Sequence, residues 1–361
     1  MGPPDEATGD GPVGIDRDPV TGWFVEHVRG VEPPLSFSLI AGGRSNLTYR
    51  VEDRAGRAFA LRRPPVSHVL PTAHDMAREY RVLTALGPTD VPVPETFGLC
   101  QDEAVNGRPF YVMDFVNGHI LRDVATAEAA FSEEARAPIG DHMAETLAGL
   151  HAVDVDAVGL GDLGRRDGYI GRQLKRWTGQ YRDMQVEGVE QGGLVEEVGS
   201  ALGERIPPQV TTAIVHGDYR LDNVVLGDDG TVAAILDWEI CTLGDPLADV
   251  GMLMVYWAGP EDGAPFLGTA APTCAAGFAG RGAVLAHYAE VSGRDVADIG
   301  FYMAFGYWKL ACILQGVYAR YVAGAGAGDT GSVDEFPRTV RRLAELAATT
   351  LAAPSGAGGL P

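Results

Sequence analysis

The spacing of hydrophobic residues changes along this chain and predicts two parts of different structure. Before residue 117, short apolar and β-branched runs alternate with Gly, Pro and Asn, which is typical of strands separated by turns. From Ser132 onward most apolar residues recur every three or four positions, which is typical of helices. We therefore predict an α+β protein with a small antiparallel-sheet N-terminal lobe and a larger, mainly helical C-terminal lobe.

The first part contains five predicted strands and one predicted amphipathic helix. We expect strands over residues 35–40, 47–51, 58–63, 97–100 and 108–115. The dipeptide Asn106-Gly107 predicts a two-residue type I′ hairpin turn before the last strand. Residues 73–86 show helical spacing, with Glu79 on or beside the buried stripe. An acid in that position needs a partner.

The chain divides into four predicted segments. We expect disordered tails over residues 1–18 and 353–361, where Gly, Pro and polar residues dominate. Residues 19–116 form the predicted N-terminal nucleotide-binding lobe, and residues 117–352 the C-terminal catalytic and substrate lobe. The end of the last strand of the first lobe, at residues 116–118, is the expected hinge.

Composition excludes some classes of function. The 361 residues carry a net charge of −21, which argues against a nucleic-acid partner because phosphate binding needs clustered Lys and Arg. No apolar run reaches the roughly 18 residues of a membrane span, and the N-terminus does not resemble a signal peptide, so we expect no membrane partner and a cytoplasmic protein. The four cysteines are far apart and predict reduced thiols rather than a zinc site.

The strongest chemical signal lies in residues 214–249. A short apolar strand ending at Val215 places His216-Gly217-Asp218 in the loop that follows it. Asn223 follows Asp218 by five positions, which is the spacing of the H-x-D-x-x-x-x-N catalytic loop. In that loop the Asp accepts the proton of an acceptor hydroxyl and the Asn binds a metal ion. We therefore predict Asp218 as the catalytic base.

Asp237 is the second predicted metal ligand. If Asp229-Gly230 are the two central residues of a hairpin turn, Asn223 lies opposite Leu236 and Asp237 lies beside that pair. An amide and a carboxylate oxygen there would suit Mg²⁺ alongside nucleotide phosphates. The alternative interpretation is that these are ordinary turn residues.

Three other polar residues of this stretch have predicted structural roles. Asp245 precedes Pro246 and is expected to cap the next helix. Asp249 is expected to accept hydrogen bonds that brace the catalytic loop, and His216 to anchor that loop by packing.

The first lobe offers candidate residues for a nucleotide. A kinase places a lysine on its third strand, but Lys175 and Lys309 are the only lysines here, so Arg62 takes that position. Arg remains charged and can bind phosphate or carboxylate in a bidentate manner. Glu79 is the expected partner of Arg62. An exposed strand residue is the alternative interpretation of Arg62.

The remaining candidate nucleotide contacts rest on weaker patterns. The Gly-rich turn before the second strand could offer backbone N–H groups, the Ser45 hydroxyl and Asn46 to phosphates, although a Gly-Gly turn needs no ligand. Backbone groups near Asp114 and Val116, at the end of the last strand, are expected to bind adenine.

The chain resembles the aminoglycoside phosphotransferase family, within it the branch related to kinase domains attached to some acyl-CoA dehydrogenases. The resemblance covers about residues 36–321 and rests on residues 43–49, 61–65, 78–80, 91–94, 216–223, 235–239 and 244–249. It implies a protein-kinase-like bilobal fold, ATP with Mg²⁺ as cofactors, and the roles above for Asp218, Asn223 and Asp237.

The resemblance implies a small-molecule hydroxyl as the phosphate acceptor and leaves its identity open. Cationic aminoglycosides would suit the acidic net charge of the chain. Hydroxyacyl compounds are the acceptors associated with the branch whose motifs the chain matches better, and we favour them. A catalytically weak nucleotide-binding pseudokinase is an alternative because the usual strand lysine is missing, and a metal-dependent hydrolase is another. The preference between ATP and GTP, and the oligomeric state, stay open.

Overall fold

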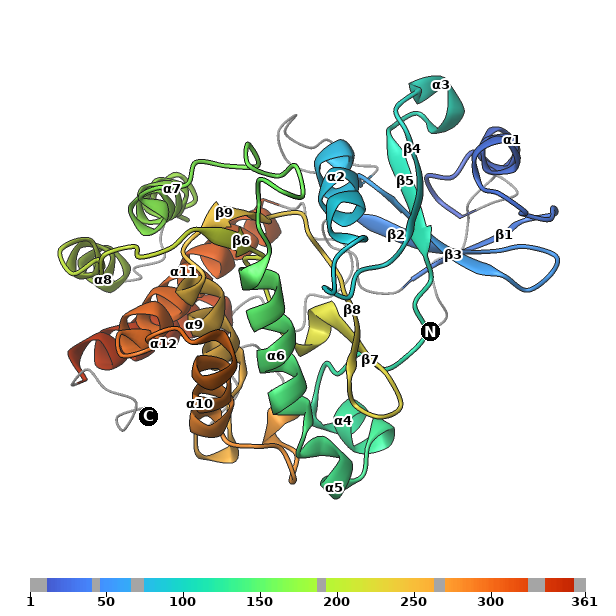
Figure 1. The fold of residues 1–361 in the computed structure, drawn as a ribbon. Coiled ribbons are helices and arrows are strands. Elements are labelled where there is room, and N and C mark those ends of the chain that lie inside the picture. Colours follow the sequence, from blue (N-terminus) through green and yellow to red (C-terminus); the bar gives the residue numbers. More distant parts are fainter. Residues whose placement is uncertain are drawn as a thin grey trace. The chain divides into compact units, whose positions relative to one another are not determined.

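The chain forms two compact units. In the computed structural model the described residues are 12–40, 46–65, 75–186, 193–262, 270–323 and 335–353. Unit 1 comprises the chain up to Asn117 together with Ala234–Glu239, and unit 2 comprises Gly118–Ala233 and the chain from Ile240 onward. Figure 1 shows their elements coloured along the sequence. The short segment Ala234–Glu239 adds Asp237 to unit 1.

Unit 1 contains an antiparallel sheet of five strands in the order β1-β2-β3-β5-β4. The predicted strands and the amphipathic helix are confirmed. The elements are α1 (Arg17–His27), β1 (Ser36–Leu39), β2 (Leu47–Glu52), β3 (Ala58–Arg63), α2 (Met76–Leu86), β4 (Thr96–Cys100), α3 (Glu103–Asn106) and β5 (Phe110–Asp114).

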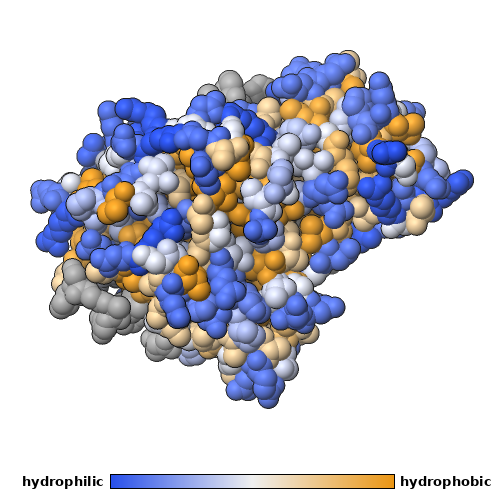
Figure 2. Space-filling model, viewed as in Figure 1, coloured by the Kyte–Doolittle hydropathy of each residue, from blue (hydrophilic) through white to orange (hydrophobic). Residues whose placement is uncertain are grey.

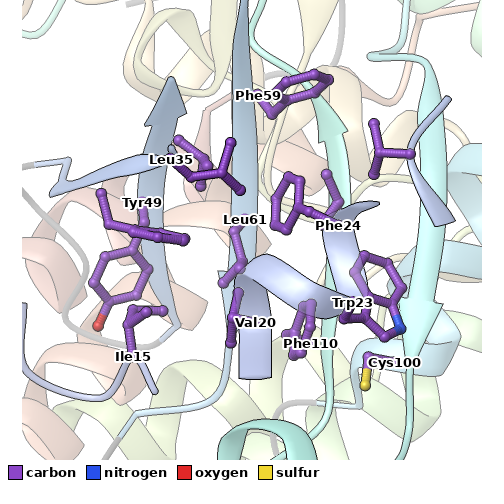
Figure 3. Close-up of a cluster of buried hydrophobic side chains, with 14 residues drawn as sticks. Ile15, Val20, Trp23, Phe24, Leu35, Tyr49, Phe59, Leu61, Cys100 and Phe110 are labelled. Atoms are coloured by element: carbon purple, nitrogen blue, oxygen red, sulfur yellow. The ribbon is translucent and has the colours of Figure 1, made fainter. Parts of the chain in front are cut away.

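The two faces of this sheet have different characters. Successive side chains of a strand point to opposite faces, and on one face Phe59 and Leu61 of β3 pack against helix α1 (Figure 3). Each fully buried Phe or Leu there contributes roughly 1.5–3 kcal/mol. The opposite face carries Arg62, which reaches Glu79 of α2. The hydrophobic face consists of Ile15, Val20, Trp23, Phe24, Val28, Leu35, Phe37, Tyr49, Val51, Phe59, Leu61, Cys100, Phe110 and Val112.

The prediction of a two-residue hairpin turn at Asn106-Gly107 is wrong. Residues Glu103–Asn106 form helix α3, which Asp102 caps and Gly107 ends with φ of 66°. The Asn106 side chain accepts a hydrogen bond of 2.9 Å from the backbone N–H of Asp16. A left-handed glycine ends a helix as readily as it builds a hairpin, and the contact of Asn106 favours the helix.

Unit 2 is mainly helical, as predicted. Strands β6 and β9 pair antiparallel, and β7 and β8 form a second two-stranded sheet. The elements are α4 (Val124–Ala130), α5 (Glu133–Arg136), α6 (Ile139–Ala152), α7 (Tyr169–Asp183), α8 (Leu194–Gly203), β6 (Ala213–Val215), η1 (Leu221–Asn223), β7 (Val224–Leu226), β8 (Val232–Ile235, of which the last two residues belong to unit 1), β9 (Thr242–Gly244), α9 (Leu247–Tyr256), η2 (Pro260–Asp262), η3 (Pro272–Cys274), α10 (Arg281–Ser292), α11 (Ile299–Val322) and α12 (Phe336–Ala352).

The connection between β7 and β8 is longer than predicted. The Gly227 N–H donates to the Thr231 carbonyl at 2.8 Å, which leaves three residues in the loop, and Gly230 has φ of 78°. The prediction of a two-residue turn centred on Asp229-Gly230 is therefore wrong, and the register derived from it does not hold. A left-handed glycine after a type I turn is the usual third residue of such a loop.

Helices α9 and α11 approach each other very closely. A Cβ atom on Gly251 of α9 would lie 2.5 Å from the carbonyl carbon of Tyr302 on α11. Real Cβ atoms do not come so near, so only glycine permits this packing. The two helices consequently support the loops that follow β6 and β9, which they contact through Asp249, Lys309 and Tyr302.

One face of the molecule shows hydrophobic residues distributed among hydrophilic ones (Figure 2). Such a mixture is normal for a folded protein. No described helix combines the length and the apolar character needed to cross a lipid bilayer.

Candidate active site

A buried cluster of charges surrounds Arg62 in unit 1. Arg62 Nε lies 2.8 Å from Glu79 Oε2, and its Nη2 lies 2.5 Å from Asp237 Oδ1 and 3.6 Å from Glu239 Oε2. Burial opposes the charge on Arg62, but the carboxylates of Glu79, Asp237 and Glu239 outweigh it and raise its pKa. The predicted pairing of Arg62 with Glu79 is present. We call these four residues, with Asn46 and Tyr111, the Arg62 cluster.

Two neutral side chains complete the Arg62 cluster. Asn46 Nδ2 donates to Glu79 Oε1 at 2.8 Å and to Glu239 Oε2 at 3.1 Å, and the Tyr111 hydroxyl donates to Glu79 Oε2 at 3.0 Å. Burial raises the pKa of Glu79, although Arg62 opposes that rise. The side-chain N–H groups of Asn46 are thus directed at carboxylates. Sequence reasoning assigned no role to Glu239. Its position two residues after Asp237 is the one sequence feature that could have indicated it.

Asp237 has a strained backbone. Its φ is 62°, and it is the single non-glycine residue with positive φ in the described parts of the chain. Such a conformation costs on the order of 1–3 kcal/mol and persists where neighbouring structure imposes it, often at functional sites. The side chain of Asp237 remains 31% exposed while it pairs with Arg62. The carboxylate is therefore paired with Arg62 and also open to a ligand.

The other predicted nucleotide contacts of unit 1 stay predictions. The N–H of Asp114 donates to the Glu95 carbonyl at 2.8 Å, so an adenine contact would use other backbone groups near Asp114 and Val116. Val116 is half-buried beyond the end of β5. Ser45 lies outside the described residues.

The catalytic loop predicted from the sequence lies in unit 2, after the buried strand β6. Asp218 is 32% exposed, and Asn223 Nδ2 donates to both its backbone carbonyl and its Oδ2 at 2.8 Å. The short 3-10 helix Leu221–Asn223 turns the chain back so that this amide reaches the carboxylate. The five-residue spacing therefore brings the predicted base and the predicted amide together.

Arg220 is a residue of this loop that sequence reasoning missed. Its Nη2 lies 3.1 Å from Asp222 Oδ2, its Nε lies 3.6 Å from Asp218 Oδ2, and its guanidinium covers the ring of Tyr256 at 4.6 Å. Burial disfavours its charge, but Tyr256 and the two carboxylates raise its pKa. The sequence feature that could have indicated Arg220 is its position two residues after Asp218. It provides a permanent positive charge beside the predicted base.

Asp249 braces the loop through backbone atoms, as predicted. Its carboxylate accepts the N–H groups of His216 at 2.6 Å and Gly217 at 2.7 Å, and it is fully buried. His151 Nε2 lies 3.4 Å from the same carboxylate. Burial would raise the pKa of Asp249, but His151 and these hydrogen bonds hold it below its usual value.

Asp245 and His216 also have the structural roles predicted for them. Asp245 Oδ1 accepts the N–H of Leu247 at the start of α9, and its Oδ2 accepts the hydroxyl of Tyr302 at 2.7 Å. His216 is fully buried, and its Nδ1 accepts the N–H of Asp218 at 3.2 Å. Asp245 therefore fixes the start of α9, and His216 fixes the backbone at Asp218.

Comparison with known families assigns the chain. The model of the phosphotransferase enzyme family matches residues 36–286. The chain belongs to this family. Its curated relatives include acyl-CoA dehydrogenase family member 10 of Mus musculus, 32% identical over 87% of this chain, and member 11 of Gallus gallus, 34% identical over 86%. The aligned regions are 29% and 40% of those proteins, so the chain spans well under half of their length.

Solved structures of similar fold agree with this phosphotransferase assignment. A Ralstonia eutropha protein, provisionally described as an aminoglycoside phosphotransferase, has a TM-score of 0.77 and 33% identity, covering 93% of this chain and 98% of its own. A choline kinase from Cryptosporidium parvum has a TM-score of 0.63 at 11% identity, covering 91% and 94%. An aminoglycoside phosphotransferase APH(4)-Ia in complex with AMP-PNP and hygromycin B has a TM-score of 0.61 at 14% identity, covering 93% and 100%. The α+β, protein-kinase-like bilobal fold and the predicted branch of the family are confirmed.

Asp237 of unit 1 and Asn223 of unit 2, the two predicted metal ligands, each carry an oxygen of the kind that Mg²⁺ prefers. Asp237 uses Oδ1 with Arg62 and keeps Oδ2 for a ligand, whereas Asn223 uses its amide nitrogen with Asp218 and keeps its single oxygen, Oδ1. Mg²⁺ prefers oxygen ligands and usually takes one or two from protein, with phosphates and water supplying the rest. In the described part of the chain, no three His, Cys, Asp or Glu side chains gather into a closed metal site.

Proposed function

We propose that this phosphotransferase moves the γ-phosphate of ATP to a hydroxyl of a small molecule. The observation that carries the proposal is the state of the catalytic loop. Asp218 is solvent-accessible, its carboxylate accepts from Asn223, and the backbone before it is anchored by Asp249. A carboxylate held this way is suited to orient a hydroxyl and take its proton.

In the proposed reaction, Asp218 of unit 2 accepts the proton of the acceptor hydroxyl. The acceptor oxygen forms a bond to the γ-phosphorus as the bond from phosphorus to the ADP oxygen breaks, and the hydroxyl proton passes to the Asp218 carboxylate. Arg220 offers a permanent positive charge at this point, 3.6 Å from Asp218 Oδ2. Because this transfer makes little covalent demand on the protein, positioning and charge supply most of the catalysis.

The residues of unit 1 are assigned to the nucleotide. Arg62 would bind ATP phosphates in place of the usual lysine, with Glu79 holding its guanidinium, and Ser45 and Asn46 would lie beside the phosphates. Backbone atoms near Asp114 and Val116 would contact adenine. Mg²⁺ held by Asp237 and Asn223 would neutralise phosphate charge.

We favour a hydroxyacyl compound as the acceptor. The support is that the curated relatives are acyl-CoA dehydrogenase family members, with identity of 32% and 34% over most of this chain. An aminoglycoside is the second candidate, favoured by the similarity to the Ralstonia eutropha protein at 33% identity. Both acceptors carry a hydroxyl group, so the same loop would serve either one.

A panel of acceptors tests the proposal. The protein is incubated with Mg-ATP and hydroxyacyl-CoAs, aminoglycosides or no acceptor, and mass spectrometry detects added phosphate. We expect phosphate on a hydroxyacyl compound. Phosphate on aminoglycosides alone would change the acceptor, and inorganic phosphate released from ATP alone would indicate a hydrolase. ATP binding without any product would indicate a pseudokinase.

Two Asp→Asn variants serve as matched controls for this experiment. Asp218→Asn removes the proposed base, whereas Asp228→Asn changes an aspartate of the β7–β8 loop whose side chain is 99% exposed. Product that disappears in the first variant and persists in the second belongs to this protein and not to a contaminating kinase.

A further inference from the structure

Lys309 is a buried ammonium group next to the catalytic loop. It lies on helix α11, is 4% exposed, and its Nζ donates to the backbone carbonyl of Gly217 at 2.8 Å. The ring of Trp177 lies 5.9 Å from the same nitrogen. Gly217 immediately precedes Asp218 in the sequence, so the contact acts on the peptide group that carries the proposed base.

Burying this charge is costly, and the surrounding groups only partly offset the cost. An isolated ammonium inside a protein loses several kcal/mol of solvation. Burial therefore lowers the pKa of Lys309, while the carboxylates of Asp218 and Asp249 oppose that decrease. A hydrophobic side chain would fill this space without the cost. We therefore infer that lysine is present at this position for its hydrogen bond to the Gly217 carbonyl, which a hydrophobic side chain cannot make.

The peptide groups around Gly217 are held from two helices. The N–H of Gly217 donates to Asp249 of α9, and its carbonyl accepts from Lys309 of α11. The next N–H, that of Asp218, donates to His216. Gly217 has φ of 88°, and a Cβ there would lie 3.0 Å from the side chain of Ile240. Each polar atom of the peptide group between Gly217 and Asp218 thus has a defined partner.

Helix α11 is well suited to hold this carbonyl in place. Tyr302 and Lys309 are seven residues apart, which places them on one face of the helix. Tyr302 holds Asp245 at 2.7 Å while Lys309 holds Gly217 at 2.8 Å. Through Gly251 the same helix packs tightly on α9, which carries Asp249.

We propose that Lys309 is a positioning residue for phosphoryl transfer, which holds the Gly217 carbonyl and thereby sets the direction of Asp218. The inference rests on the proposed function because it takes Asp218 as the base. It extends that function to a helix 92 residues further along the chain. Asp249 fixes the N–H side of Gly217, and Lys309 fixes the carbonyl side.

Steady-state kinetics of two matched lysine variants test the proposal. Lys309→Met keeps the length of the side chain and removes the donor, and Lys175→Met changes the exposed lysine of α7, the one other lysine of the chain. Because displacement of a reacting group by about 1 Å costs on the order of 100-fold, we expect kcat of Lys309→Met to fall about 10- to 100-fold. The KM for ATP should change less than about twofold, since no nucleotide contact is removed.

The conservative variant and the control separate positioning from a merely structural role. Lys309→Arg keeps a charged donor and should recover part of the kcat lost in Lys309→Met. Turnover of Lys309→Met equal to that of Lys175→Met would overturn the inference while leaving the proposed function intact. Absence of phosphoryl transfer in the unmodified protein would remove the proposed function, and the role of Lys309 with it.

Nuclear magnetic resonance of the unmodified protein tests the contact itself, even if a variant fails to fold. Labelling with 15N-lysine produces signals from only two side chains, because the chain has two lysines. We expect one Nζ with protons protected from solvent exchange, assigned to Lys309 by its loss in Lys309→Met. Rapid exchange at both lysines would contradict a buried hydrogen bond to Gly217.

Discussion

The Arg62 cluster and the loop around Asp218 are stabilised by different kinds of contact. In the Arg62 cluster, side chains pair with side chains, and one guanidinium lies among the carboxylates of Glu79, Asp237 and Glu239. In the loop, the backbone groups of Gly217 are held by the buried side chains of Asp249 and Lys309.

This difference follows the demands of the two parts of the proposed reaction. Side-chain ion pairs can exchange one partner for another, so Arg62 and Asp237 can turn to a phosphate or a cation with little change in the backbone. Backbone clamps cannot exchange partners without moving the chain, which suits a base that must stay within hydrogen-bond reach of a hydroxyl. We therefore expect substitutions in the first region to alter ligand binding and substitutions in the second to alter turnover or folding.

The largest effect is expected for Asp218→Asn. Loss of the base should reduce kcat by about 10³-fold, within the range for general-base catalysis, while ATP binding measured by calorimetry is retained. Wild-type turnover in this variant would exclude Asp218 as the base.

Asp249→Ala should cause the next largest effect, on stability. Two buried N–H groups, those of His216 and Gly217, would lose their acceptor. Each unsatisfied buried donor costs about 1–3 kcal/mol, so we expect a loss of about 3 kcal/mol in the free energy of unfolding, measured by urea denaturation. Asp228→Ala is the matched exposed control. Equal unfolding midpoints in the two variants would contradict a structural role for Asp249.

Asp237→Ala should weaken nucleotide binding and leave the loop of unit 2 intact. Removing the carboxylate removes the proposed metal ligand, and we expect the Kd for Mg-ATP to rise by about 10-fold, or 1.4 kcal/mol. Binding of ATP measured in EDTA should change much less. An equal change with and without Mg²⁺ would show that Asp237 serves Arg62 rather than a metal ion.

The smallest effect concerns pH and His151. Burial lowers the pKa of His151 below its ordinary value of 6.5. The unfolded chain then binds a proton more readily than the folded protein, so the stability from neutral His151 is complete above about pH 6.5 and declines as the pH falls below it. His151→Gln should show a smaller decrease in Tm between pH 7.5 and 5.5 than the unmodified protein. An equal decrease in both proteins would assign this pH dependence to other groups.

Local sequence patterns predicted the elements well where short-range preferences and burial agree. Strand β3 runs from Ala58 to Arg63 as expected, because a short apolar run ends there and Pro64-Pro65 cannot continue a sheet. The prediction failed at Asn106-Gly107, because a glycine that adopts positive φ is equally compatible with a hairpin turn and with the end of a helix. Asn106 contacts the backbone of Asp16, which is 90 residues away in sequence, so no local sequence pattern predicts this hydrogen bond.

The candidate site was predicted in part for a similar reason. The pair Asp218 and Asn223 is encoded by spacing within one loop, and Arg62 was paired with Glu79 because a buried acid requires a cation. Arg220 was missed although it lies inside the same loop, since an arginine near acids is ordinary on a protein surface. The hydrogen bond from the Asp114 N–H to the Glu95 carbonyl is likewise not visible in the sequence.

The sequence alone predicted most helices and strands and the loop that joins Asp218 to Asn223, and it determined that the third strand lacks a lysine, because each depends on neighbouring residues or on composition. The tertiary structure alone decided which distant residues complete that loop. Lys309 and Gly217 are 92 positions apart, and their contact exists because α11 packs against α9 through a glycine. Hydrogen bonds depend on distances of about 3 Å, and for residues far apart in sequence only the folded chain sets such distances.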